Sequence, residues 1–310
     1  MRVVFAGTPE VALPALDAVA ASDHELVGVV TRPDAPAGRG RKLVASPVAQ
    51  RAEELGLPVL KPDHPRDPDF QEALRALVPD CCPVVAYGAM LPQSALDIPP
   101  LGWVNLHFSV LPAWRGAAPV QHAIWAGDEV SGATTFRIVK ELDAGPTFGL
   151  MTETIRPRDT AGDLLGRLAE GGSGLLVATL DGIEDGSLEA REQHPEGLSL
   201  APKITVEDAR IDWSEHAVAI DRRIRACAPF PGAWSTHEGE RIKIGPVTPV
   251  DVDLAPGVLE VTRTAVLVGA GTFAVQLGEV KANGRKQMLA ADWARGVRLE
   301  PGTRFGDADA

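Results

Sequence analysis

The sequence predicts an α/β fold: a Rossmann-like, mostly parallel sheet flanked by helices, followed by a small C-terminal β-barrel that is OB-like. The chain opens with a strand, a helix and a second strand, which favours parallel strands with helices on the sheet faces. After a polar segment, short strands separated by turn residues dominate, as in small barrels. A chain of 310 residues is long enough for two domains. We expect a first domain at 1–188, a linker at 189–205 and a second domain at 206–310.

The first element is an apolar strand at 2–6, and the turn Gly7-Thr8-Pro9 leads into a helix at 10–20. Thr8 is expected to cap that helix, with Pro9 at the first helical position. The turn lacks the second and third glycines of the dinucleotide-binding fingerprint, and no GxxxxGK[ST] motif occurs in the chain. A dinucleotide-dependent oxidoreductase is therefore suggested only by the strand-helix-strand opening.

Strands and helices continue to alternate through the first domain. The expected strands are at 25–30, 58–60, 81–86, 103–108, 132–139 and 147–155, and the expected helices at 47–55, 67–77, 117–126 and 160–180. Thr160 and Asp163 form a capping box at the start of the last helix. Glycines at 171, 172 and 174 each cost about 1 kcal/mol relative to Ala, so this helix has a place for a kink or break. The second domain is expected to hold a helix at 215–226 and strands at 233–237, 241–247, 257–261, 265–269 and 272–280.

Composition and charge restrict the possible functions. The chain is 45% hydrophobic and 23% charged, which is ordinary for a soluble globular protein. A net charge of -12 argues against a broad basic surface that coats nucleic acid, although the chain can still have local basic patches. Cys81, Cys82 and Cys227 have neither metal-ligand nor disulfide-framework spacing. The N-terminus is typical of a strand rather than a signal peptide, and no apolar run is long enough to span a membrane. We therefore expect a cytoplasmic protein with no metal and no membrane partner.

The most informative stretch is residues 103–121, WVNLHFSVLPAWRGAAPVQ. Alternation along the strand places Asn105 and His107 on one face, so both side chains point into one cleft. A convergent amide and imidazole polarise a carbonyl and stabilise the oxyanion that forms when it is attacked. Asp143, in LDAGP, would orient the imidazole if it lies opposite. From the spacing alone, an ordinary structural role for these residues stays open.

The motifs NLHFSVLP at 105–112, WRGAAP at 114–119 and LDAGP at 142–146 resemble the signature of the folate-dependent formyltransferases. The resemblance implies that Asn105, His107 and Asp143 are the catalytic trio. It implies 10-formyltetrahydrofolate as the formyl donor and co-substrate. The residues that it places in the folate site are Tyr87, Met90, Leu91, Ser109, Val110, Leu111, Pro112 and Leu142.

The loop at 31–46 carries a net positive charge within an acidic chain, because it holds four cationic residues and a single acidic one, Asp34. Flexible basic loops suit phosphate backbones, although the charges alone favour a solvated surface loop without a partner. The run PAGRGRK resembles the insertion with which tRNA-formylating members of the family enter the acceptor arm of initiator tRNA. That resemblance implies tRNA contacts by Arg39, Arg41 and Lys42. A second basic patch is formed by Lys281, Arg285, Lys286, Arg295 and Arg298.

The activity implied by the resemblance is formyl transfer to the α-amine of methionine on initiator tRNA, for translation initiation. We expect direct attack by the amine, since no Ser or Cys beside a base presents itself as a covalent nucleophile. We also expect the enzyme to be a monomer. The alternatives are a formyltransferase acting on an amino sugar or a nucleotide, a formyl-folate hydrolase, and a folate- or RNA-binding module without catalysis.

Overall fold

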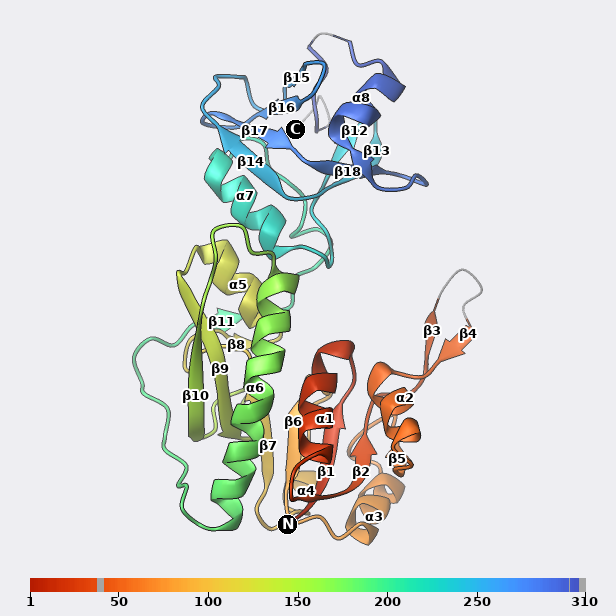
Figure 1. Cartoon of the computed structure of the whole chain (residues 1–310), viewed down its shortest axis with the longest axis vertical. Helices are drawn as coiled ribbons and strands as arrows, with labels where there is room; N and C mark the ends of the chain where they lie inside the picture. The colour runs from red at the N-terminus through yellow and green to blue at the C-terminus, as the bar shows by residue number, and fades with distance from the viewer. Residues whose placement is uncertain (38–41, 301, 307–310) are drawn as a thin grey trace. The chain divides into compact units, whose positions relative to one another are not determined.

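The computed structural model describes residues 1–37, 42–300 and 302–306. Within these residues the N-terminal part is built on one sheet whose strands are β1 (Arg2–Gly7), β2 (Glu25–Val30), β5 (Val59–Leu60), β6 (Cys82–Val85), β7 (Trp103–His107), β9 (Val130–Arg137) and β10 (Thr147–Thr154). Their order is β10-β9-β7-β6-β1-β2-β5 (Figure 1). Neighbours from β7 to β5 are parallel, whereas β9 is antiparallel to both β7 and β10. This confirms the expected mostly parallel sheet.

The strand order creates a switch point between β1 and β6. The chain proceeds outward from β1 through β2 to β5, and then returns to the other side of β1 with β6 and β7. In open α/β sheets, ligands bind beyond the carboxyl ends of the strands at such a point. There the Thr8 hydroxyl, just after β1, donates to the carbonyl of Tyr87, just after β6, at 2.8 Å. Thr8 therefore does not cap the following helix as expected, because its hydroxyl joins two strand ends instead.

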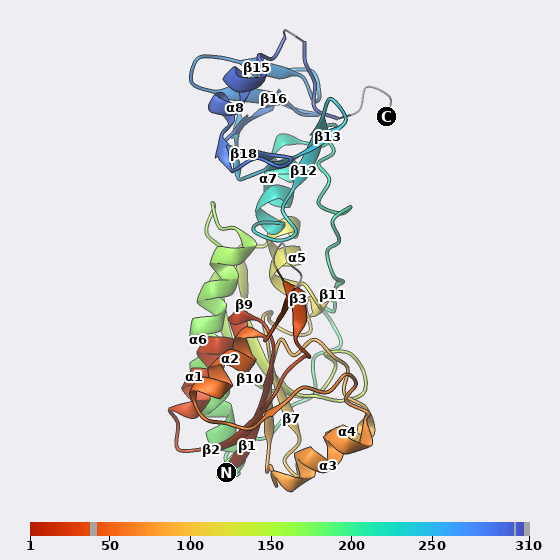
Figure 2. The same ribbon diagram turned by 90° about the vertical axis from the view of Figure 1, so that its right-hand side faces the viewer.

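Helices cover both faces of the sheet. They are a 3-10 turn (Glu10–Ala12), α1 (Leu13–Ala20), α2 (Pro47–Glu54), α3 (Pro68–Ala76), α4 (Gln93–Leu96) and α6 (Ala161–Glu184). Figure 2 shows α1, α2 and α6 on one face and α3 and α4 on the other. Phe70 and Leu74 of α3 and Leu96 of α4 pack with Trp103 of β7 in one apolar cluster.

The glycines of α6 allow close packing rather than a break. The helix runs without interruption from Ala161 to Glu184. A Cβ atom on Gly171 would lie 2.8 Å from Cε of Met151, and one on Gly172 would lie 3.0 Å from Cδ2 of Leu106. The helix therefore contacts β10 and β7 through its glycines. At its start, Asp163 accepts from the Thr160 backbone and donates its own N–H to the Thr160 hydroxyl, which confirms the capping box.

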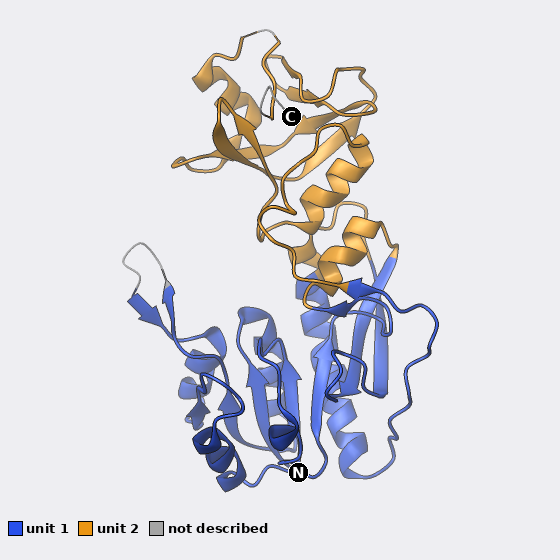
Figure 3. Ribbon diagram, turned by 180° about the vertical axis from the view of Figure 1, so that it is seen from behind, with its two compact units in different colours: residues 1–116, 130–154, 165–200 blue, residues 117–129, 155–164, 201–310 orange. Residues whose placement is uncertain are grey.

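The chain divides into two compact units (Figure 3). The first comprises residues 1–116, 130–154 and 165–200, and the second residues 117–129, 155–164 and 201–310. The second unit contains α5 (Pro119–Ala126), α7 (Ala217–Ala226) and α8 (Ala290–Val297). Two antiparallel sheets accompany them: β12 (Trp234–His237), β13 (Glu240–Ile244), β18 (Glu279–Ala282) and β19 (Met288–Leu289) in one, and β14 (Val247–Val250), β17 (Ala274–Leu277), β16 (Val266–Gly269) and β15 (Leu259–Val261) in the other.

Two long strands expected in the second unit are each divided. The stretch 241–247 turns at Gly245-Pro246, and the stretch 272–280 turns at Gly278, so each contributes to both sheets. The two corners pack together, since Gly245 N donates to Glu279 O at 2.8 Å and a Cβ on Gly278 would lie 2.7 Å from Pro246 O. Glycine is needed at the second corner because no side chain fits there. Helix α8, with Trp293 buried, was not expected from the sequence.

The basic loop at 31–46 contains a β-hairpin formed by β3 (Ala35–Ala37) and β4 (Lys42–Val44). Its pairing is antiparallel, with Ala37 opposite Lys42 and Ala35 opposite Val44. Every side chain of β4 is exposed, including Leu43 at 69%. Arg39 and Arg41 lie outside the described residues.

Candidate active site

The site lies at the carboxyl end of β7, next to the switch point. Burial follows the predicted alternation: Trp103 packs with α3 and α4, whereas Leu106 lies against α6. Asn105 and His107 therefore project from the Trp103 face of the sheet. Asn105 is half-buried, and within the described residues its side-chain amide has no hydrogen-bond partner. Its amide is free to bind a group that enters this end of the sheet.

The His107 ring is held through one nitrogen and leaves the other open. Nε2 lies 2.9 Å from the carbonyl oxygen of Trp114. Because a carbonyl oxygen only accepts, Nε2 carries a proton and donates it there. Nδ1 lies 3.8 Å from Oδ2 of Asp143, which is ion-pair range but longer than a hydrogen bond. The ring also meets Phe136 of β9 edge-on, and only 6% of His107 is exposed. The imidazole is fixed in place, with Nδ1 as the nitrogen that can act on a ligand.

Asp143 reaches His107 from the loop between β9 and β10. Its Oδ2 accepts from the backbone N–H of Gly116 at 2.8 Å, so the carboxylate is anchored beside the imidazole. The backbone of Asp143 is left-handed, with φ of 48°, a conformation that costs a non-glycine residue roughly 1 to 3 kcal/mol. Trp114, the acceptor for His107, is also left-handed, with φ of 61°. The structure thus brings His107 and Asp143 together, as expected, through two unusual backbone conformations.

The loop that follows β7 is pinned by a threonine on the neighbouring strand. Thr134 of β9 donates its hydroxyl proton to the Ser109 carbonyl at 2.7 Å and accepts from the Leu111 N–H at 3.1 Å. The Ser109 hydroxyl donates to the Ala113 carbonyl at 2.6 Å, so it closes the turn. Leu111 is buried, Val110 and Pro112 are half-buried, and the bond between Leu111 and Pro112 is cis. The sequence alone gave no signal for Thr134.

The remaining expected folate contacts lie on two loops. Tyr87 is buried and shares an apolar cluster with half-buried Leu91, directly after β6. Burial raises the pKa of the Tyr87 hydroxyl, and the Arg32 guanidinium opposes that effect. Met90 is 63% exposed in the same loop, and Leu142 is 55% exposed beside Asp143. Two large apolar side chains therefore lie open to solvent around the site.

Two further residues of the site come from the stretch expected to be a linker. Gln193 donates from Nε2 to the carbonyls of Asp143 and Gly145, and Ser199 accepts through Oγ from the Trp114 N–H. Sequence reasoning missed both residues, because nothing in a polar stretch with Pro and Gly marks which side chain turns inward.

A family model described as "Formyl transferase" matches residues 1–180, and one described as "Formyl transferase, C-terminal domain" matches residues 203–298. The chain belongs to the formyl transferase family. It is 76% identical over 312 residues to a protein of Nocardioides sp. named "Methionyl-tRNA formyltransferase", with 99% of each chain covered. It is 65% identical to the protein of that name from Streptomyces coelicolor, covering 99% of this chain and 100% of the relative.

Among solved structures, the fold resembles HypX from Aquifex aeolicus in complex with tetrahydrofolic acid, with a TM-score of 0.68 and 19% identity. The alignment covers 95% of this formyl transferase chain but 47% of HypX, so the chain spans about half the length of that protein. A methionyl-tRNA formyltransferase from Clostridium thermocellum aligns over 89% of this chain and 98% of its own, with a TM-score of 0.56 and 12% identity. At these identities the likeness concerns the fold.

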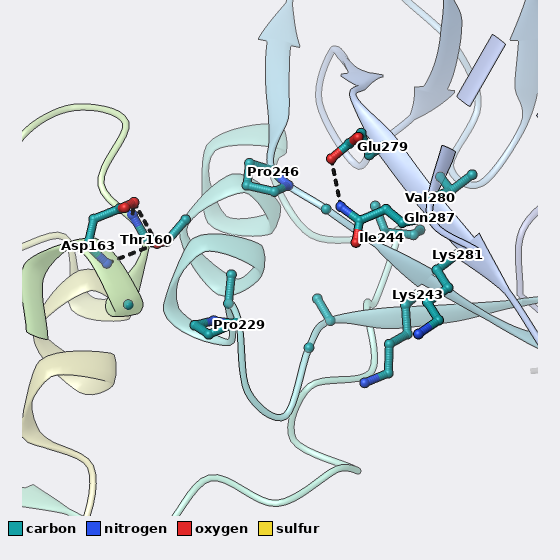
Figure 4. Close-up of a pocket in the computed structure, with 15 residues that line it drawn as sticks. Thr160, Asp163, Pro229, Lys243, Ile244, Pro246, Glu279, Val280, Lys281 and Gln287 are labelled. Atoms are coloured by element: carbon teal, nitrogen blue, oxygen red, sulfur yellow. Dashed lines mark hydrogen bonds between the residues drawn. The ribbon is translucent and has the colours of Figure 1, made fainter. Parts of the chain in front are cut away.

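The second unit of this formyl transferase chain carries a cleft of about 410 Å³. Figure 4 shows Lys243 and Lys281 along one wall, with Glu279 and Pro246 nearby and Thr160 and Asp163 across from them. The Lys243 ammonium donates to the Pro231 carbonyl at 2.8 Å, and Gln287 donates to the Glu279 carboxylate at 2.6 Å. Both signs of charge line this cleft, so it is not a purely basic groove.

The described part of this formyl transferase chain shows neither a metal centre nor a membrane-spanning helix. Across residues 1–37, 42–300 and 302–306, no group of three or more His, Cys, Asp or Glu side chains is arranged to hold a metal ion. No helix in the described part of the chain has the length and apolar character needed to cross a bilayer.

Proposed function

We propose that this chain is a methionyl-tRNA formyltransferase, which moves the formyl group of 10-formyltetrahydrofolate to the α-amine of methionine on initiator tRNA. The observation that carries the proposal is the anchored pair of His107 and Asp143 beside the open amide of Asn105. Relatives of 65% and 76% identity that match over the full length and carry that name support it. The reaction belongs to translation initiation, in the cytoplasm.

The amine nitrogen attacks the formyl carbon, a new C–N bond forms, and the carbonyl oxygen becomes an oxyanion. Asn105 donates to that oxyanion, and His107 donates from Nδ1 in its imidazolium form, in which both ring nitrogens carry protons. The Trp114 carbonyl holds Nε2 and so prevents the ring from turning. The tetrahedral intermediate collapses by breaking the bond to the folate nitrogen. Asp143, directly or through a water, accepts the amine proton and returns one to the leaving nitrogen.

The folate site is formed, in this proposal, by two loops beyond the carboxyl ends of β6 and β7. Tyr87, Met90 and Leu91 line one side, and the turn Ser109, Val110, Leu111 and Pro112 lines the other. Exposed apolar surface at Met90, and at Leu142 on the Asp143 loop, suits a flat aromatic ligand that covers it on binding. The complex of HypX with tetrahydrofolic acid supports the assignment of a folate donor.

We also propose that residues 206–310 act as a tRNA-binding domain, whose two sheets wrap as a partly open, OB-like barrel, and that the enzyme works as a monomer. The exposed strand β4, with Lys42 next to Leu43, supports a role for the hairpin in docking rather than in the core. Arg39, Arg41 and Lys42 then contact the acceptor end. Arg39→Ala should weaken tRNA use and reduce the salt slope of tRNA binding by about 1, with folate binding unchanged.

The test mixes purified protein with 10-formyltetrahydrofolate and methionine-charged initiator or elongator tRNA, and follows formyl incorporation. We expect strong preference for the initiator and little formate release without tRNA. Release of formate at the same rate with and without tRNA would indicate a hydrolase instead. Intact folate binding with no transfer to either tRNA would indicate a different amine acceptor, or a binding module.

A further inference from the structure

Two side chains of the polar segment 191–200 turn toward the active site. Gln193 and Ser199 are half-buried, whereas residues 191, 192, 194–198 and 200 are exposed. A surface segment that buries two polar side chains places them against particular partners, because buried polar groups need hydrogen bonds. The partners of Gln193 and Ser199 belong to the two loops that hold His107 and Asp143.

The Gln193 amide is fully used. Its Nε2 donates to the carbonyls of Asp143 and Gly145, each at 2.8 Å. Its Oε1 accepts from Nε of Arg115 at 3.0 Å and from Nη2 at 2.6 Å. A glutamine amide offers two donor hydrogens and two acceptor lone pairs, and all four are engaged here. Few residue types could replace it, because the contacts require donors and acceptors at the two ends of one planar group.

These contacts hold a backbone that would otherwise relax. Asp143 has φ of 48°, and the hydrogen bond from Gln193 Nε2 to the Asp143 carbonyl oxygen opposes rotation away from that value. Gly116, next to Arg115, donates to the Asp143 carboxylate at 2.8 Å. Gln193 thus joins the main chain of Asp143 to Arg115, whose neighbour holds the Asp143 side chain.

The same segment holds the acceptor of His107. Ser199 accepts from Trp114 N–H through its hydroxyl and from Arg115 N–H through its carbonyl, each at 2.9 Å. Trp114 in turn accepts from Nε2 of His107 through its carbonyl. A continuous set of hydrogen bonds therefore runs from His107 through Trp114, Ser199 and Arg115 to Gln193 and Asp143.

We propose that Gln193 is a positioning residue for formyl transfer: it fixes the Asp143 backbone, and through it the placement of the carboxylate beside Nδ1 of His107. This inference rests on the proposed function, since it concerns the same reaction. It does not require Gln193 to touch either substrate. Its loss should therefore lower kcat and leave the KM for 10-formyltetrahydrofolate nearly unchanged.

The test uses Gln193→Ala and Gln193→Glu in the full chain. A glutamate keeps the acceptor for Arg115 but removes both donors to the Asp143 loop, so the variant keeps its link to Arg115 while losing the contacts to Asp143. We expect kcat to fall roughly 10- to 100-fold in both variants, as for a small misplacement of a reacting group. Gln93→Ala, which removes an exposed glutamine bonded to Asp97, is the matched control and should keep wild-type kcat.

A double-mutant cycle with Asp143→Ala separates positioning from a general structural role. If Gln193 acts through Asp143, Gln193→Ala should change single-turnover rates less than about twofold in the Asp143→Ala chain. Additive losses in the cycle, or a wild-type kcat in Gln193→Glu, would overturn the positioning role while leaving the proposed function intact. Absence of formyl transfer by the unaltered chain would overturn both.

Discussion

Thr134 offers a test of how the loop after β7 is built. The side chain is 1% exposed, donates to the Ser109 carbonyl and accepts from the Leu111 N–H. Thr134→Val keeps the shape of the side chain and removes both hydrogen bonds. The change therefore acts on the turn at residues 109–112, which we assign to the folate site, without altering any residue of that turn.

The size of the effect follows from the two backbone groups left without partners. A buried donor or acceptor that loses its partner costs roughly 1 to 3 kcal/mol, so the two together set an upper limit of about 6 kcal/mol. Relaxation of the loop toward water lowers that limit. We expect the free energy of unfolding to fall by about 2 to 4 kcal/mol, and the KM for 10-formyltetrahydrofolate to rise as the turn loosens.

The adjacent residue supplies the control. Thr135 is fully buried on the opposite face of β9, where its hydroxyl pairs with Thr179 at 2.8 Å and accepts from Gly149 N–H at 3.1 Å. Thr135→Val should lower stability by a similar amount and leave the folate KM unchanged. Urea unfolding gives the stability and formyl incorporation gives the KM. Equal KM changes in the two variants, or an unaltered KM in Thr134→Val, would refute the reasoning.

Three further predictions concern other parts of the chain. Asn105→Ala, His107→Ala and Asp143→Ala should each keep the fold and lose roughly 10²- to 10³-fold in turnover, measured in single-turnover assays; near-normal turnover would remove that residue from the mechanism. In α6, a Cβ on Gly174 would have no neighbour within 4 Å, so Gly174→Ala should raise the free energy of unfolding by about 0.4 to 1 kcal/mol. A Cβ on Gly172 would lie 3.0 Å from Leu106, so Gly172→Ala should not raise it. Equal shifts of the urea midpoint in the two variants would contradict this. Burial raises the pKa of the Cys81 thiol to about 12, so as the pH rises the unfolded chain loses this proton before the folded chain does. The free energy of unfolding, measured by urea unfolding, should therefore decrease between about pH 9 and about pH 12, and it should decrease less steeply in Cys81→Ala.

Much of the site could be predicted because it follows from local rules. Alternation places Asn105 and His107 on one face of β7, and the strand-helix-strand opening indicates a parallel sheet whose carboxyl edge binds ligands. The prediction that Asp143 acts with His107 came from the family resemblance and not from any rule of spacing. The structure brings the two within 3.8 Å through contacts with Gly116 and Trp114.

The residues that were missed are those whose contacts are distant in sequence. Gln193 lies 50 residues from Asp143 and 78 from Arg115, and its polar surroundings resemble those of any surface segment. The corners at Gly245 and Gly278 were missed for a related reason. Each is a glycine within an apolar run typical of one long strand, and only the packing of one corner on the other shows why the run divides. Such pairings depend on the folded chain as a whole.

Left-handed backbone at non-glycine residues marks the places where this site is held against local preference. Ala86, Trp114 and Asp143 have φ between 48° and 61°, and each lies beside a group assigned to the reaction or to the folate site. A contact to a distant segment lies at or next to each of them: Thr8 binds Tyr87, which follows Ala86, Ser199 binds Trp114, and Gln193 binds Asp143. Because strained backbone persists only where its surroundings enforce it, these three contacts help to set the geometry of the site. A substitution at one of these contacts should therefore lower the rate more than it lowers the stability of the fold. A substitution of a buried residue of the sheet should do the opposite.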